Sequence, residues 1–147
     1  MPRIQNVSRD DIEKGRHIRD SKFGCVLIQI SDPDSDHPTP AWIFDKKYQF
    51  KFLDIEDHQD CINDNWRPSQ NDAEQIAYAL KEAMASGMDV VVHCHMGVCR
   101  SGAVTAAGEI LGFEPVEPAE SPNASLKKKL LSALGLGFDP ETSAFNN

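Results

Sequence analysis

The sequence predicts a single α/β domain with a mainly parallel central sheet flanked by helices. Strand-length apolar runs alternate with segments of helical periodicity, and the runs at 23–30 and 90–92 are almost continuously apolar. Strands that are buried on both faces are typical of parallel sheets. The 147 residues are enough for one domain with a proper core. We therefore expect one domain over residues 1–147, with a flexible tail at residues 136–147.

The first half of the chain predicts one short helix and two strands. Ser8, with Asp11 three residues later, indicates the start of a helix that runs to about Ile18. The run at 23–30 predicts a central strand, and alternating aromatic residues at 48–53 predict a half-buried one. The Asp-, Ser- and Pro-rich stretch between these strands indicates a loop.

The second half predicts a further strand and three helices. The strand covers residues 90–92, and the helices are expected at residues 69–87, 101–112 and 123–134. Ser69 or Asn71 caps the first of these helices, and Asn123 caps the last. Residues 113–122 contain three prolines, which indicates a surface connection.

Composition and charge argue against several classes of function. The net charge of −8 argues against a nucleic-acid partner. No apolar run approaches the roughly 20 residues that cross a bilayer, and the N-terminus lacks the apolar stretch of a secretory signal. We therefore expect a cytoplasmic protein with no membrane partner. The four cysteines show neither a disulfide framework nor the spacing of a zinc site, so no metal or cofactor is expected.

The segment 90–107 carries the clearest functional signal. A Val-rich strand ends at Cys94, Arg100 follows six positions later, and a helix starts there. Gly97 allows the intervening loop to turn, so that successive backbone N–H groups face inward and form an anion site with the helix N-terminus. The same local field favours a thiolate at Cys94, and Arg100 offers two-pronged hydrogen bonding to a phosphoryl group. This combination predicts phosphoryl transfer through a phosphocysteine.

A nine-residue string around this loop resembles the signature of cysteine-dependent protein tyrosine phosphatases, His-Cys-x-x-Gly-x-x-Arg-Ser. It reads His93-Cys94-His95-Met96-Gly97-Val98-Cys99-Arg100-Ser101. It is most similar to small dual-specificity-like members and to a bacterial and phage-type branch of predicted tyrosine phosphatases. The resemblance implies the phosphatase fold, with Cys94 attacking phosphorus, Arg100 clamping the phosphoryl oxygens and Ser101 hydrogen-bonding the sulfur. The backbone amides from His95 to Arg100 would then cradle the phosphate.

The resemblance also implies a general acid on an earlier loop. Asp54 ends the aromatic alternation in a Phe-x-Asp-Ile pattern that resembles the bacterial and phage-type branch. Asp57 is the second candidate, and Asp60 or no acid at all is the third possibility. All three aspartates lie in residues 54–68, an irregular stretch whose length is more typical of a functional loop than of a simple connection.

The expected function is therefore a metal-free phosphatase that acts on phosphotyrosine in a protein or peptide. Phosphoserine and phosphothreonine remain open as further substrates. The alternatives are a phosphate-binding pseudophosphatase and another thiolate enzyme, such as a sulfurtransferase or an arsenate reductase. The spacing of Cys94 and Cys99 also resembles the loop of low-molecular-weight phosphatases, which implies a reversible disulfide after oxidation. A packed thiol is the alternative interpretation of Cys99.

Overall fold

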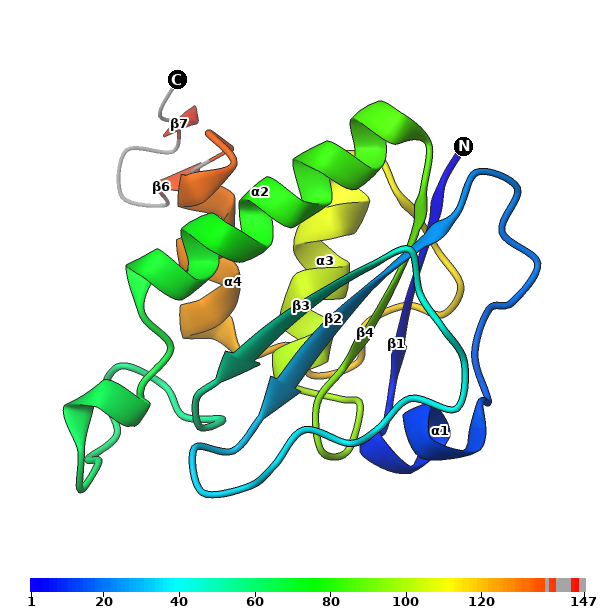
Figure 1. Cartoon of the computed structure of the whole chain (residues 1–147). Coiled ribbons are helices and arrows are strands. Elements are labelled where there is room, and N and C mark those ends of the chain that lie inside the picture. Colours follow the sequence, from blue (N-terminus) through cyan, green and yellow to red (C-terminus); the bar gives the residue numbers. More distant parts are fainter. Residues whose placement is uncertain (137, 140–143, 146–147) are drawn as a thin grey trace.

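Five strands form one parallel sheet in the order β3-β2-β4-β1-β5 (Figure 1). Their bounds are Arg3–Val7 for β1, Cys25–Ser31 for β2, Lys46–Lys51 for β3, Asp89–His93 for β4 and Glu114–Pro115 for β5. Every neighbouring pair runs parallel. The structure, a computed structural model, describes residues 1–136, 138–139 and 144–145. It confirms the predicted α/β class and the parallel sheet.

Helices cover the two faces of the sheet unequally. Three of them pack on one face, with the bounds Gln70–Ser86 for α2, Arg100–Leu111 for α3 and Ala124–Ala133 for α4 (Figure 1). The main apolar core lies between these helices and the sheet. The opposite face carries α1 (Arg9–Lys14) and loops over a smaller cluster that includes Ile12, Leu27 and Val91. The sheet is therefore enclosed on one side by long helices and on the other mainly by loops.

Local capping explains where the helices begin and end. The Ser8 side chain accepts a hydrogen bond from the backbone N–H of Asp11, whose carboxylate accepts from that of Ser8, as the predicted capping box requires. Ser69, not Asn71, caps α2 with the same arrangement. The prediction that α1 reaches Ile18 is wrong, because Gly15 adopts the left-handed conformation that ends a helix (φ 72°).

Two strands, β1 and β5, were not predicted from the sequence pattern. The strand β1 alternates poorly because its polar residues have partners elsewhere in the fold: Asn6 Nδ2 donates to the Gly97 carbonyl (2.8 Å), and Gln5 accepts from the Ile18 N–H (2.8 Å). The two-residue strand β5 pairs with β1 inside residues 113–122. The prediction of a simple surface connection there is therefore wrong at Glu114–Pro115.

The last residues form a short antiparallel pair, β6 (Phe138–Asp139) and β7 (Ala144–Phe145). The predicted flexible tail at residues 136–147 falls largely on 137, 140–143 and 146–147, which lie outside the described residues. Within the described ranges, no helix combines the length and hydrophobicity needed to span a bilayer.

Candidate active site

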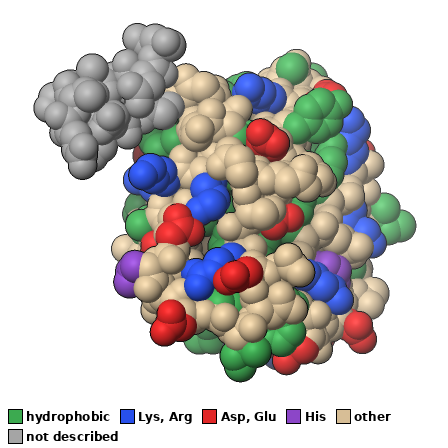
Figure 2. Space-filling view, turned by 90° about the vertical axis from the view of Figure 1, so that its left-hand side faces the viewer, with side chains coloured by type: hydrophobic (Ala, Val, Ile, Leu, Met, Phe, Trp, Pro, Cys, Tyr) green, Lys and Arg blue, Asp and Glu red, His purple; other side chains and the backbone are tan. Residues whose placement is uncertain are grey.

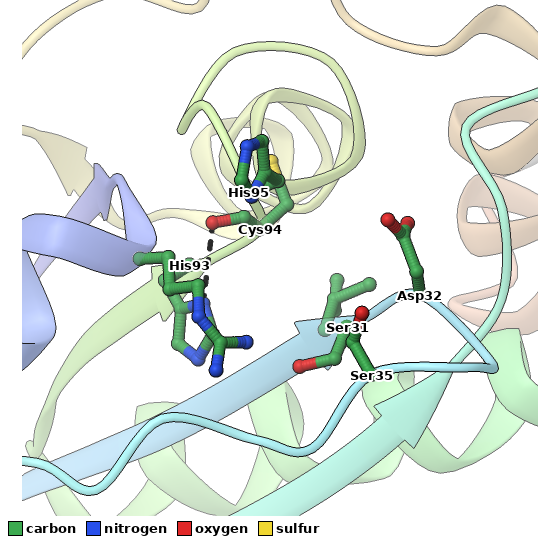
Figure 3. Close-up of a pocket in the computed structure, with 8 residues that line it drawn as sticks. Ser31, Asp32, Ser35, His93, Cys94 and His95 are labelled. Atoms are coloured by element: carbon green, nitrogen blue, oxygen red, sulfur yellow. Dashed lines mark hydrogen bonds between the residues drawn. The ribbon is translucent and has the colours of Figure 1, made fainter.

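The predicted phosphate loop lies at the carboxyl edge of the sheet. It follows β4, which is flanked by β2 and β1, so the loops after three neighbouring strands meet around it. Cys94 and His95 line a small cavity there together with Asp32 and Ser35, which come from the loop after β2 (Figure 3). Ligands of open parallel sheets bind at such edges, so the fold brings the predicted nucleophile to a suitable place.

The loop is anchored through its carbonyl groups. The His95 carbonyl accepts from the Arg9 N–H at 3.1 Å, and the Gly97 carbonyl accepts from Asn6 Nδ2 at 2.8 Å. Gly97 has a φ of 74° and packs directly against the backbone of Val7, where any Cβ would clash. In the described part of the chain, the N–H groups of residues 95–99 donate to no protein acceptor. With its carbonyls held, the loop keeps a row of amide donors for an anion.

Cys94 is buried at the start of this loop. Its side chain is 3% exposed, and its Sγ lies 3.2 Å from the Oγ of Ser101, which is fully buried. The preceding His93 is also fully buried, and its Nδ1 lies 3.3 Å from the Cys94 carbonyl (Figure 3). Burial lowers the pKa of His93 to about 4, so its imidazole is neutral near pH 7. Cys94 thus has a hydroxyl partner from α3 and a rigid neutral neighbour on β4.

The guanidinium of Arg100 is fixed along one edge only. Its Nη1 donates to Asp32 Oδ1 at 2.7 Å and to the Phe52 carbonyl at 2.8 Å. Its Nε is buried and has no partner among the described residues. An unpaired buried donor costs about 1–3 kcal/mol, and a phosphoryl oxygen is a strong partner for a guanidinium. The Nε edge of Arg100 is therefore the part of the side chain that suits an anion.

Asp32 is a site residue that the sequence did not predict. It lies in a loop with three other aspartates and directly follows the last residue of β2. The sequence feature that could have indicated Asp32 was its position at the carboxyl end of a strand. The sequence does not show, however, that this strand lies next to β4. The structure brings Asp32 to Arg100 because β2 pairs with β4.

Asp54 lies beside the phosphate loop. Its Oδ1 accepts a hydrogen bond from Asn123 Nδ2 at 2.9 Å, and its side chain is solvent-exposed. Burial, together with the nearby Asp54 carboxylate, raises the pKa of the Cys99 thiol above its ordinary value. Asn123 also links this carboxylate to the phosphate loop, because its backbone N–H donates to the Cys99 carbonyl at 2.9 Å.

Asp57 is directed elsewhere. Its two carboxylate oxygens lie 2.8 and 2.9 Å from Nζ of Lys129 on α4, and its backbone N–H donates to Ser125 Oγ. Asp60 is exposed in the same loop. Of the three candidate acids, Asp54 is the one that described hydrogen bonds link to the phosphate loop, through Asn123.

No disulfide joins Cys94 to Cys99 or to either of the other two cysteines, all of which are described. Among the described residues, no group of three His, Cys, Asp or Glu side chains is arranged to hold a metal ion. The remaining predicted loop residues, Met96 and Val98, lie between His95 and Cys99, with the Met96 side chain largely exposed.

Comparison with known proteins gives few matches. No protein-family model matches the chain, and no curated protein matches it. One similar solved structure is Tk-PTP, a protein tyrosine phosphatase, in its active form. It is 17% identical to this chain, and the alignment covers 90% of this chain and 78% of Tk-PTP with a TM-score of 0.42.

Proposed function

We propose that this protein is a cysteine-dependent phosphatase that hydrolyses phosphomonoesters, with phosphotyrosine in a protein or peptide as its substrate. The observation that carries the proposal is the arrangement around Cys94. A buried thiol 3.2 Å from Ser101 Oγ begins a loop with unpaired amide donors, and the unpaired Nε of Arg100 follows it. A nucleophile and a set of donors for a dianion in one loop favour phosphoryl transfer.

In the first step, the Cys94 thiolate attacks phosphorus and the bond to the leaving oxygen breaks. The loop amides and Arg100 stabilise the charge on the other phosphoryl oxygens. Asp54 gives its proton to the leaving oxygen, which departs as an alcohol or phenol. The product of this step is a phosphocysteine on Cys94.

In the second step, water attacks the phosphocysteine and Asp54 takes the proton that the water loses. The bond between sulfur and phosphorus breaks, and the hydroxyl of Ser101 donates a hydrogen bond to the departing sulfur. Inorganic phosphate leaves, and Cys94 returns to its thiolate form. Every group in this cycle belongs to the chain, to the substrate or to water.

Two contacts support Asp54 over Asp57 as the acid. Asp54 is exposed and is linked through Asn123 to the Cys99 carbonyl, whereas the carboxylate of Asp57 is paired with Lys129. Asp57→Asn is therefore the matched control for Asp54→Asn, since both remove one charge from the same loop. With phenyl phosphate, whose poor leaving group needs a proton, we expect Asp54→Asn to lower kcat about 100-fold or more, and Asp57→Asn to change it less than about threefold. Equal losses in the two variants would contradict the assignment.

The test of the function itself is hydrolysis of p-nitrophenyl phosphate. We expect turnover by the wild-type chain, none by Cys94→Ser, and a phosphoryl adduct on the peptide containing Cys94 after rapid acid quench. Phosphate or vanadate binding without turnover would identify a pseudophosphatase. Turnover that survives in Cys94→Ser would refute a phosphocysteine mechanism, and activity on thiosulfate or arsenate alone would indicate another thiolate enzyme.

A further inference from the structure

Asn123 connects three segments of the site. It is 4% exposed and lies at the N-cap of α4. Its backbone N–H donates to the Cys99 carbonyl at 2.9 Å, and its Nδ2 donates to Asp54 Oδ1 and to the Ile55 carbonyl, both at 2.9 Å. Its Oδ1 accepts from the Leu126 N–H at 2.9 Å. One buried residue therefore joins the phosphate loop through its backbone, and the loop of Asp54 and the start of α4 through its side chain.

Helix capping explains only part of this arrangement. The cap uses the side-chain oxygen of Asn123, which Ser, Thr or Asp could supply equally well. Among these residues, only asparagine also carries an amide NH₂ group. That NH₂ group donates to Asp54 and Ile55, so it acts on the loop that carries Asp54 (residues 54–68, the acid loop).

The rest of the acid loop is also attached to α4. Glu56 accepts from the backbone N–H groups of Ala124 and Ser125 at 2.8 and 2.9 Å, where a helix N-terminus favours negative charge. Asp57 pairs with Lys129. Figure 2 shows the face of the molecule that contains this loop and α4, where acidic and basic side chains lie next to one another. These contacts hold the loop, but they do not hold the carboxylate of Asp54.

We propose that Asn123 is a positioning residue for the general acid, an inference that rests on the proposed function of Asp54. Asp54 is exposed on an irregular loop, where an unrestrained side chain samples several rotamers. Its hydrogen bond to Asn123 fixes the carboxylate relative to Cys99, whose carbonyl the same residue holds. Because a misplacement of about 1 Å can cost about 100-fold in rate, this restraint matters for proton transfer.

The test is Asn123→Ser, which keeps a capping oxygen and the backbone N–H but removes the NH₂ group. The matched control is Asn63→Ser, because Asn63 caps the 3₁₀ helix η1 (Asp64–Trp66) of the same loop. Urea unfolding establishes that both variants fold. If Asn123→Ser does not fold, Asn123→Asp keeps the capping oxygen and also lacks the donor.

The decisive readout is the dependence of kcat on the leaving group. Phenyl phosphate has a poor leaving group that needs a proton, whereas p-nitrophenyl phosphate has a good one that needs it far less. We expect Asn123→Ser to lower kcat about 10- to 100-fold with phenyl phosphate and less than about threefold with p-nitrophenyl phosphate. Asp54→Asn should show the same selectivity, and the double variant should be no slower than Asp54→Asn alone.

Other results would overturn the inference. Equal losses on both substrates, or effects of Asn123→Ser and Asp54→Asn that multiply in the double variant, would assign Asn123 to capping alone. A wild-type chain that hydrolyses neither substrate would refute the proposed function, and this inference with it. A selective Asp54→Asn beside an unaffected Asn123→Ser would refute the inference and leave the function standing.

Discussion

Replacement of Gly97 by alanine is expected to displace the phosphate loop. A Cβ at this position would lie 2.6 Å from the carbonyl carbon of Val7 and 2.7 Å from the backbone N of Ser8. Both are backbone atoms where β1 meets α1, so neither can move aside as a flexible side chain would. The loop must retreat by about 0.8 Å to reach an ordinary contact of 3.4 Å.

The expected magnitude follows from two costs. The φ of 74° costs alanine about 1–2 kcal/mol, and overpacking typically costs about 1–3 kcal/mol more. The free energy of unfolding should therefore fall by about 2–5 kcal/mol. A displacement near 1 Å is also expected to lower kcat/KM about 100-fold, because the amide donors move relative to the Cys94 sulfur.

Gly135→Ala is the matched control, since Gly135 has the same φ of 74° and no described residue lies within 4 Å of an added Cβ. In Gly135→Ala, the free energy of unfolding should fall only by the cost of the positive φ, about 1–2 kcal/mol, and kcat/KM should stay unchanged. The assays are urea unfolding and hydrolysis of p-nitrophenyl phosphate. Equal stability and equal kcat/KM in the two glycine variants would refute the predicted clash at Gly97.

Two further predictions concern the groups that support the loop. Asp32→Ala should lower kcat/KM about tenfold, because Arg100 loses the ion pair that fixes one edge of its guanidinium. Asp34→Ala, at an exposed position of the same loop, is the control and should leave kcat/KM unchanged. Equal effects of the two variants in steady-state assays would contradict this role of Asp32. Burial lowers the pKa of His93 from 6.5 to about 4, so between these values the unfolded chain binds a proton that the folded chain does not. The free energy of unfolding should therefore fall as the pH drops from 6.5 to 4, with about 3 kcal/mol due to this group. Urea unfolding over this pH range should show a shallower fall for His93→Gln, and an unchanged slope would rule out His93 as the cause.

The features that were predictable from the sequence depend on contiguous residues. The capping box of Ser8 and the ends of α2 follow from backbone hydrogen bonds within a few positions. The loop from Cys94 to Arg100 is likewise local, because a strand, a glycine turn and a helix start follow one another in the chain. For such features, the conformation of each residue is limited mainly by its neighbours in sequence.

The remaining features were decided by the tertiary structure. The place of β1 between β4 and β5 depends on polar side chains such as Asn6, whose partner is 91 positions away. Asp32 lies 68 positions from Arg100, and Asp54 lies 69 positions from Asn123. The local pattern around Asp54 made it a candidate acid, but no local pattern indicates that it contacts Asn123. None singles out Asp32 as the partner of Arg100. Their contacts exist only because the strand order and the packing of α4 bring separate loops to one edge of the sheet.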